Sequence, residues 1–206
     1  MQKIWMKIAA PVAAIAMIAG FAAAPVFAAT NAGNMELSAQ VNIDNSSQTI
    51  SGVSGSNTST TTTLYGSFGY FLNKNFQFGI AELLSDTKAS VGGGPTIELA
   101  ISSTDGFVKW HFILPDNPVL VPWVGGYLGI LALTVNSAGS TSTGSGTSYG
   151  PAVGIKYFVQ ENTSINAEYR ILFSSLTITP PSGPSVSATQ SDNILLFGLS
   201  VYFGGK

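Results

Sequence analysis

The stretch "LLFGLSVYFGGK", residues 195–206, decides the fold class because one of its two faces is continuously apolar. Successive side chains of an extended strand point to opposite faces. One face carries Leu195, Phe197, Leu199, Val201 and Phe203, and the other carries Leu196, Gly198, Ser200 and Tyr202. A soluble β-sandwich would turn the apolar face inward, whereas a membrane barrel would turn it outward into lipid.

The composition favours the membrane. Of the 206 residues, 45% are hydrophobic and only 9% are charged, compared with roughly 25% charged residues in soluble globular domains. The many glycines, hydroxyl residues and aromatics favour strands and turns over helices. Because the chain contains no cysteine, disulfides and thiolate metal sites are excluded.

The N-terminus is typical of a secretory signal peptide. Lys3 and Lys7 precede a long apolar run, and Val26-Phe27-Ala28 provides a suitable cleavage site, so we expect residues 1–28 to be removed between Ala28 and Ala29. The mature chain, residues 29–206, would keep six basic and ten acidic residues, since two of the eight basic residues are lost. This acidic balance gives no indication of a nucleic-acid partner.

Period-two alternation recurs along the mature chain and predicts eight strands. The clearest is residues 35–43, where Met35, Leu37 and Ile43 share the apolar face. The other expected strands are 64–72, 76–84, 96–112, 119–133, 149–159, 164–173 and 195–203. Short turns follow the second, fourth and sixth strands, and longer polar loops follow the first, third, fifth and seventh.

These connections predict an all-β fold, an eight-stranded antiparallel up-and-down transmembrane β-barrel with short periplasmic turns and longer extracellular loops. No segment after Ala28 offers about 20 uninterrupted apolar residues for a spanning helix, and only a helix or a closed barrel satisfies every backbone group in lipid. Aromatics near the turns could form the periplasmic girdle, namely Tyr70, Phe76, Phe112, Trp123, Tyr157 and Phe203. A secreted calyx with an apolar interior is the soluble alternative.

The phrases "GYFLNKNFQFGI", "VPWVGGYLGI", "VGIKYFVQENTSINAEYRILF" and "FGLSVYF" together resemble the small eight-stranded outer-membrane β-barrel proteins of Gram-negative bacteria, the group of OmpX-like, OmpW-like and OmpA-barrel families. The spacing of Gly198, Val201 and Phe203 is similar to the barrel-assembly signal of such proteins. Leu196 and the trailing Gly204-Gly205-Lys206 depart from that signal. The resemblance implies a monomer in contact with outer-membrane lipid and lipopolysaccharide, inserted by the barrel-assembly machinery.

Six ionisable residues fall on the predicted inner face: Glu36, Lys109, His111, Lys156, Glu168 and Arg170. Buried charges are costly unless they are paired, and the lumen of an eight-stranded barrel is just wide enough for side chains to fill. We therefore expect a network of ion pairs in the lumen, with Lys156 across a short turn from Glu168 and Arg170. A polar plug is favoured over a path for protons or solutes.

No catalytic, cofactor or metal site is expected. His111 is the only histidine, and a metal site needs several convergent ligands. Some eight-stranded barrels are lipid A deacylases with a lipid-facing serine two residues after the histidine, but Ile113 occupies that position here. The chain is therefore predicted not to be an enzyme.

Three functions fit the sequence. The first is an integral outer-membrane protein with a structural or surface-exposed role and a side-chain-filled lumen. The second is OmpW-like transport of small hydrophobic compounds, for which Leu83, Phe107, Ile194 and Leu196 could line an apolar pocket. The third is adhesion through the Ser/Thr/Gly-rich extracellular loops.

Overall fold

The structure, a computed structural model, describes residues 30–49, 56–90, 96–137 and 139–204. The predicted signal peptide, residues 1–28, and the terminal Gly205-Lys206 lie outside the described residues. Among the residues described, no helix is long and apolar enough to cross a membrane.

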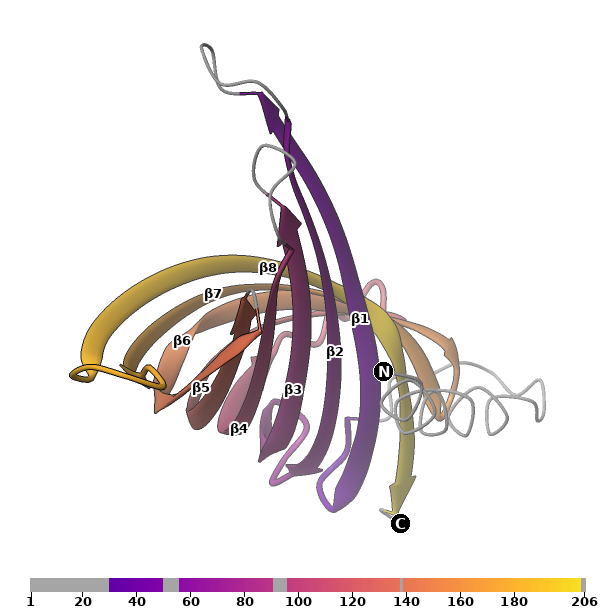
Figure 1. The fold of residues 1–206 in the computed structure, drawn as a ribbon. Helices are drawn as coiled ribbons and strands as arrows, with labels where there is room; N and C mark the ends of the chain where they lie inside the picture. The colour runs from indigo at the N-terminus through magenta and orange to yellow at the C-terminus, as the bar shows by residue number, and fades with distance from the viewer. Residues whose placement is uncertain (1–29, 50–55, 91–95, 138, 205–206) are drawn as a thin grey trace.

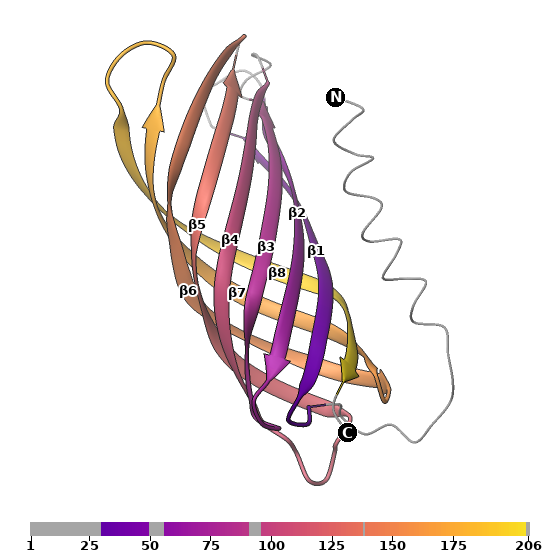
Figure 2. The same ribbon diagram turned by 90° about the horizontal axis from the view of Figure 1, so that it is seen from below.

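Eight antiparallel strands form a ring in which each strand pairs with its neighbours in chain order (Figures 1 and 2). They are β1 (Asn34–Thr49), β2 (Ser56–Phe71), β3 (Phe76–Ser90), β4 (Ile97–His111), β5 (Leu120–Ser137), β6 (Ser140–Gln160), β7 (Thr163–Thr179) and β8 (Val186–Gly204). The last strand pairs with the first and closes the ring. The predicted up-and-down barrel is confirmed.

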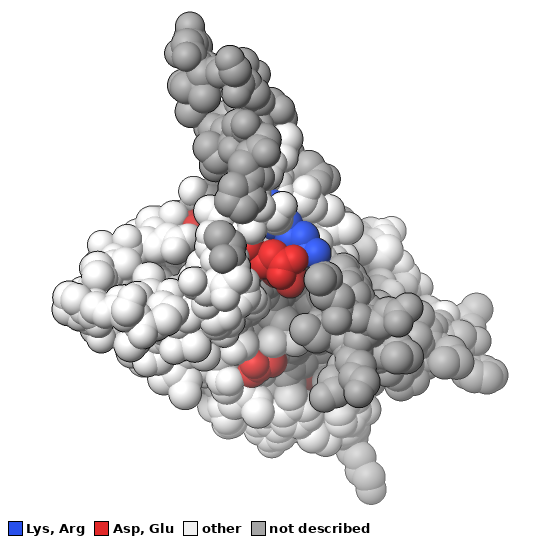
Figure 3. All heavy atoms as spheres, viewed as in Figure 1, with Lys and Arg blue, Asp and Glu red and all other residues white. Residues whose placement is uncertain are grey.

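The barrel has its apolar face outside. On β8, Leu195 and Phe197 are 44% and 53% exposed, whereas Leu196 and Ser200 are fully buried in the lumen. The outward set on β5, which includes Leu128 and Ile130, is exposed in the same way. The alternation predicted from sequence therefore has the phase of a membrane barrel, with an apolar belt formed by exposed apolar side chains on the outward face of all eight strands. Few charged side chains are visible on the face of the molecule shown in Figure 3.

One member of the predicted aromatic girdle is misplaced. The ring of Trp123 is only 2% exposed and lies in the lumen, whereas Tyr70, Phe112, Tyr157 and Phe203 face outward as expected. The strand phase explains the difference, because Val124 next to Trp123 faces lipid and adjacent side chains point to opposite faces. Gly154 on β6 leaves room for the indole, since a Cβ there would lie 2.5 Å from the Trp123 ring.

The long polar loops predicted from sequence are largely strand. β1 and β2 continue to Thr49 and from Ser56, and β5 and β6 are separated only by residues 138–139. At this end of the barrel, which we call the loop end, side-chain hydroxyl groups form hydrogen bonds between neighbouring strands, for example between Thr61 and Thr87 at 2.9 Å. Threonine has a high strand propensity. Antiparallel pairing satisfies the backbone hydrogen-bonding groups of these segments whether their side chains contact lipid or water. The asymmetry between the two ends thus lies in strand extension more than in loop length.

At the opposite end of the barrel, which we call the turn end, short connections join β2 to β3, β4 to β5 and β6 to β7. At residues 72–75, the carboxamide oxygen of Asn73 accepts hydrogen bonds from the backbone N–H of Asn75 at 2.8 Å and of Phe76 at 2.9 Å. This is an Asx-type turn, for which asparagine is favoured. The connection between β4 and β5, residues 112–119, is longer than the predicted five-residue turn.

The apolar belt gives a test of the fold. Ile80 on β3 is 64% exposed beside lipid-facing Phe68, so Ile80→Lys should lower the free energy of unfolding in lipid vesicles by about 2–4 kcal/mol. Thr60→Lys, on the outer face of the loop-end extension, should change it by less than about 1 kcal/mol. Equal effects of the two substitutions in a denaturant titration would contradict the assigned belt.

Candidate functional site: the ion-pair plug of the lumen

The six predicted inner residues come from four strands and are all buried. Glu36 lies on β1, Lys109 and His111 on β4, Lys156 on β6, and Glu168 and Arg170 on β7, and each is at most 3% exposed. Period-two alternation places all of them in the lumen, because each shares the phase of its strand's other inward side chains. The structure brings five of them into two ion-pair clusters.

The first cluster is built around Glu36. Its carboxylate forms an ion pair with Lys156 across the lumen and accepts hydrogen bonds from Gln77 Nε2 at 2.7 Å and from Ser200 Oγ at 2.5 Å. Four strands therefore meet at one carboxylate. Carboxylates buried with this many donors can stay charged because their oxygens are satisfied.

The expected pairing of Lys156 with Glu168 and Arg170 is not found. In the register of β6 and β7, Lys156 faces Asn166 while Glu168 faces Gly154. Glu168 instead has two cationic partners from β4 and its own strand. The Lys156 side chain instead crosses the lumen to Glu36 on β1. Because β6 and β1 are not adjacent strands, the alternation within each strand cannot predict this contact.

The second cluster is a chain of charges centred on Glu168. Its carboxylate lies 2.7 Å from Arg170 Nη2 and 3.4 Å from Lys109 Nζ. Arg170 Nη1 lies 3.6 Å from Asp105 Oδ2, and the other oxygen of Asp105 accepts hydrogen bonds from Ser103 at 2.7 Å and Ser148 at 3.0 Å. The chain thus runs through four charged side chains.

Asp105 is the site residue that the sequence prediction missed. It lies on β4 in phase with Lys109 and His111, four and six residues away, and is 1% exposed. The alternation along β4 could therefore have placed Asp105 on the inner face from sequence alone. Including it balances the interior, because three carboxylates, on Glu36, Asp105 and Glu168, face the three cations of Lys109, Lys156 and Arg170, and each is paired.

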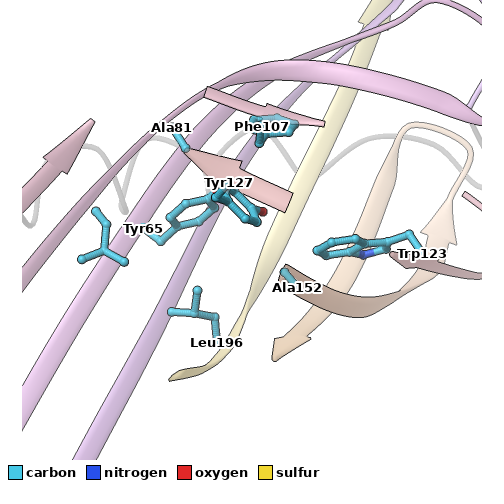
Figure 4. Close-up of a cluster of buried hydrophobic side chains, with 8 residues drawn as sticks. Tyr65, Ala81, Phe107, Trp123, Tyr127, Ala152 and Leu196 are labelled. Carbon is cyan, nitrogen blue, oxygen red and sulfur yellow. The ribbon is translucent and has the colours of Figure 1, made fainter. Parts of the chain in front are cut away.

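Aromatic rings enclose the cations. Lys109 Nζ lies 4.1 Å from the centre of the Trp123 ring, and Arg170 Cζ lies 3.6 Å from that of Tyr127 and 4.5 Å from that of Tyr65. Desolvated cation–π contacts of this kind stabilise by about 2 kcal/mol each. Figure 4 shows the rings of Tyr65, Tyr127 and Trp123 projecting inward from the barrel wall. We call the two clusters with these rings the plug.

His111 is placed near the plug without an ion-pair partner. Its ring packs 5.1 Å from that of Phe71 and 6.4 Å from that of Trp123, measured between ring centres. Neither ring nitrogen has a hydrogen-bond partner within the described part of the chain. The imidazole is fully buried and faces the lumen, away from lipid.

The four residues considered for a transport pocket are packed together with the plug. Leu83, Phe107 and Leu196 belong to a buried cluster with Tyr65, Trp123 and Tyr127, and Ile194 packs against it. Leu196 is fully buried. Within the described ranges, no group of three or more histidine, cysteine, aspartate or glutamate side chains is placed to hold a metal ion.

The three positions of the predicted assembly signal lie on β8. Val201 and Phe203 are on the outward face, and Gly198 is inward opposite Gln40 of β1. A Cβ at Gly198 would lie far inside contact distance of the Ala39 backbone, so the close approach of β8 to β1 requires glycine here. Recognition of these residues by assembly machinery stays a prediction.

Removing one partner of a buried ion pair should destabilise the barrel more than removing both partners. Lys156→Met leaves the buried Glu36 carboxylate without its cation and should lower the free energy of unfolding by about 3–5 kcal/mol. The double substitution Glu36→Gln with Lys156→Met should restore most of that loss. Lys88→Ala, which removes an exposed pair with Glu98, should cost less than about 1 kcal/mol. A loss for Lys156→Met as small as that of Lys88→Ala would refute a buried pair.

Comparisons with known proteins agree with this architecture. The chain matches a family model described as "Outer membrane protein beta-barrel domain" over residues 13–203. No curated protein sequence matches it.

Solved structures with the same fold include outer membrane protein OprG from Pseudomonas aeruginosa, with 15% identity, TM-score 0.53, and coverage of 85% of this chain and 98% of that one. Neisserial surface protein A has 19% identity, TM-score 0.54 and coverage of 84% and 98%. Outer membrane protein AlkL has 16% identity, TM-score 0.55 and coverage of 90% and 96%. The inside-out barrel and the family match together show that the chain belongs to the outer membrane β-barrel domain family and is an integral protein of the outer membrane.

Proposed function

We propose that this protein is a sealed outer-membrane barrel with a structural and surface-exposed role, which carries no solute through its lumen. The main support for this proposal is the plug. Its charges are neutralised within the barrel, its cations are covered by aromatic rings, and its members are nearly inaccessible to solvent. An aqueous channel would need polar side chains that line an open, water-accessible path.

Packing above and below the plug supports a sealed lumen. Toward the turn end, a second apolar cluster consists of Phe71, Val121, Phe158 and Tyr202. Toward the loop end, Leu131, Leu133 and Leu176 form a third, buried cluster. Side chains therefore fill the interior at several depths, as expected for a barrel of eight strands.

This packing weighs against the transport alternative. Passage of small hydrophobic compounds would need open apolar walls, but Leu83, Phe107 and Leu196 are buried against the rings of the plug. A compound could enter only after those rings had moved.

The loop end supplies the surface-exposed part of the proposal. Here the strands continue beyond the apolar belt as walls rich in serine and threonine. Cross-strand hydroxyl contacts join Thr63 to Ser85 at 3.1 Å and Thr58 to Ser90 at 3.2 Å. We assign this end to the cell exterior and the turn end to the periplasm, the usual orientation of such barrels. Lipopolysaccharide would surround a monomer whose insertion depends on the barrel-assembly machinery.

We further propose that the protein has no enzymatic activity. The lone histidine, His111, is buried in the lumen beside Phe71 and Trp123, so it cannot reach a lipid substrate on the outer wall. The residue two positions later is Ile113. The outer wall formed by the described residues therefore has no histidine that could act as a base there.

Planar-bilayer recording tests the sealed lumen. The purified wild-type barrel should show no steady conductance, because the plug leaves no continuous water path. A variant with alanine at Lys109, Glu168 and Arg170 removes three long side chains from the lumen and should conduct, provided that it still migrates faster unheated than heated on a gel. Stable wild-type channels would contradict the proposal.

The predicted export signal can be tested on protein purified from outer membranes. The mature N-terminus should be Ala29, as read by mass spectrometry of the intact chain. Ala28→Trp places a bulky residue at the cleavage position and should leave residues 1–28 attached. Wild-type protein that retains those residues in the outer membrane would refute the assignment.

A further inference from the structure

The ring is closed over only part of its height. β1 pairs with β8 as far as Val41 opposite Phe197. β1 nevertheless continues to Thr49, paired with β2, and β8 begins at Val186, paired with β7. Figures 1 and 2 show the loop-end halves of β1 and β8 diverging from each other. At the loop end, the wall of a single chain is therefore parted between two strand edges.

Both edges present their backbone hydrogen-bonding groups at odd-numbered residues. The N–H of Tyr202 donates to the carbonyl of Asn162 on the β7 side, so even-numbered residues of β8 face β7 and odd-numbered residues face β1. Each pair in the closed part joins two residues of the same parity, such as Val41 and Phe197. Odd-numbered residues of β1 therefore face β8 in turn.

Neither edge has a strand partner within the described residues beyond the closed part. The carbonyl of Leu195 accepts a hydrogen bond from Asn42 Nδ2 at 2.7 Å, a side-chain donor where the β1 backbone would otherwise serve. Unpaired edges are templates for further strands. Protected edges usually carry lysine or proline, but residues 42–49 of β1 and 186–196 of β8 contain neither.

The directions of the two strands determine what fits between them. β1 and β8 are antiparallel, so a single inserted strand would be antiparallel to one edge and parallel to the other. Parallel pairing is slightly less stable per residue. Two strands that are antiparallel to each other would instead form an antiparallel ladder with each edge. A second copy of this chain carries such a pair, because its own β8 and β1 are exposed at the same gap.

Two-fold symmetry brings the edges of two copies together at matching depths. Copies of the same orientation in one membrane are related by an axis along the membrane normal, which leaves every residue at its own depth. β1 of one copy then runs antiparallel to β8 of the other, with odd-numbered residues facing, in the register of the closed part. The contact forms twice, because such an interface is isologous.

The side chains next to the closed part agree with this arrangement. Ile43 on β1 and Leu195 on β8 are opposite each other when the register of the closed part is continued. Both are exposed apolar residues of the outer face, 67% and 44% accessible. Pairing between copies would keep both on the outer face, so the apolar belt would continue from one copy to the next.

We propose that two copies join at the loop end by reciprocal strand pairing, in which residues 43–49 of β1 of each copy pair with residues 189–195 of β8 of the other. The closed parts of the two barrels stay separate, while their loop-end parts share one continuous wall. Each copy would insert as a monomer and meet its partner by lateral diffusion. The contact involves only the strand edges and does not depend on whether the lumen is sealed.

Engineered cysteines test the pairing, because the chain has no cysteine of its own. Continued register places position 47 opposite Ser191, and facing residues of an antiparallel ladder lie within the range that a disulfide bridges. Ser47→Cys and Ser191→Cys copies with different tags, co-expressed in outer membranes and treated with copper phenanthroline, should form a covalent heterodimer. Either variant alone should form less than a tenth as much.

Asp192→Cys is the matched control, since adjacent side chains of a strand point to opposite faces. Its mixture with Ser47→Cys should also form less than a tenth as much heterodimer. The double variant Ser47→Cys with Ser191→Cys separates pairing between copies from closure within one chain. It should migrate as a covalent dimer on a non-reducing denaturing gel. Equal cross-linking of the control, or a monomer without free thiols from the double variant, would overturn the proposal.

Ser191 also provides a pair of variants without cross-linking. Ser191→Pro removes an N–H that faces the gap and should weaken dimerisation about tenfold, while Ser191→Ala should dimerise like wild type. Energy transfer between labelled copies in lipid vesicles, followed as the lipid is diluted, measures both. Heat-modifiable migration verifies folding, and the cysteine pairs decide the question if Ser191→Pro does not fold. A wild-type chain that stays monomeric at every dilution, or equal dimerisation of the two folded variants, would refute the pairing.

Discussion

The structure depends on the requirement that backbone N–H and C=O groups find partners where no water is available. In hydrocarbon that requirement leaves a helix or a closed ring of strands, and this chain closes a ring by pairing β8 with β1. Closure needs a close approach of the two end strands, which Gly198 permits because a Cβ there would collide with the Ala39 backbone. Beyond Val41 and Phe197, where β1 and β8 stop pairing, the side chain of Asn42 donates a hydrogen bond to the carbonyl of Leu195 and meets the same requirement.

Closing the ring in lipid also determines the interior. Alternation that turns leucine, isoleucine and phenylalanine outward turns glutamate, lysine and arginine inward. Those charges lose their hydration in a lumen of this width, and only mutual pairing offsets the free-energy cost of that loss. The two clusters around Glu36 and Glu168 meet that condition, and the rings of Trp123 and Tyr127 cover the remaining faces of the cations. The sealed lumen that we propose rests on the satisfaction of these groups within the barrel.

Much of this was predictable from sequence, because a period of two reports directly on the two faces of a strand. The outward faces of β1 and β8 and the inward placement of Glu168 and Arg170 follow from it. The partner of Lys156 does not, since the ion pair with Glu36 spans the lumen between strands far apart in the chain. The strand extensions were also missed, because serine- and threonine-rich segments resemble loops until their pairing is known. The pairing of β1 with β8 stops at Val41 and Phe197, and the alternation of residues does not predict where it stops.

The central claim is that the alternating faces of the strands are turned inside out, with lipid on the apolar side. Three leucines of β8 test it within a few residues: Leu195 is exposed and Leu199 half-buried on the outward face, and Leu196 is fully buried in the lumen. In a methyl-labelled sample in lipid nanodiscs, nuclear Overhauser effects to lipid acyl-chain protons should appear for Leu195 and Leu199 and be absent for Leu196. Acyl-chain contacts at Leu196, or none at Leu195 and Leu199, would contradict the account.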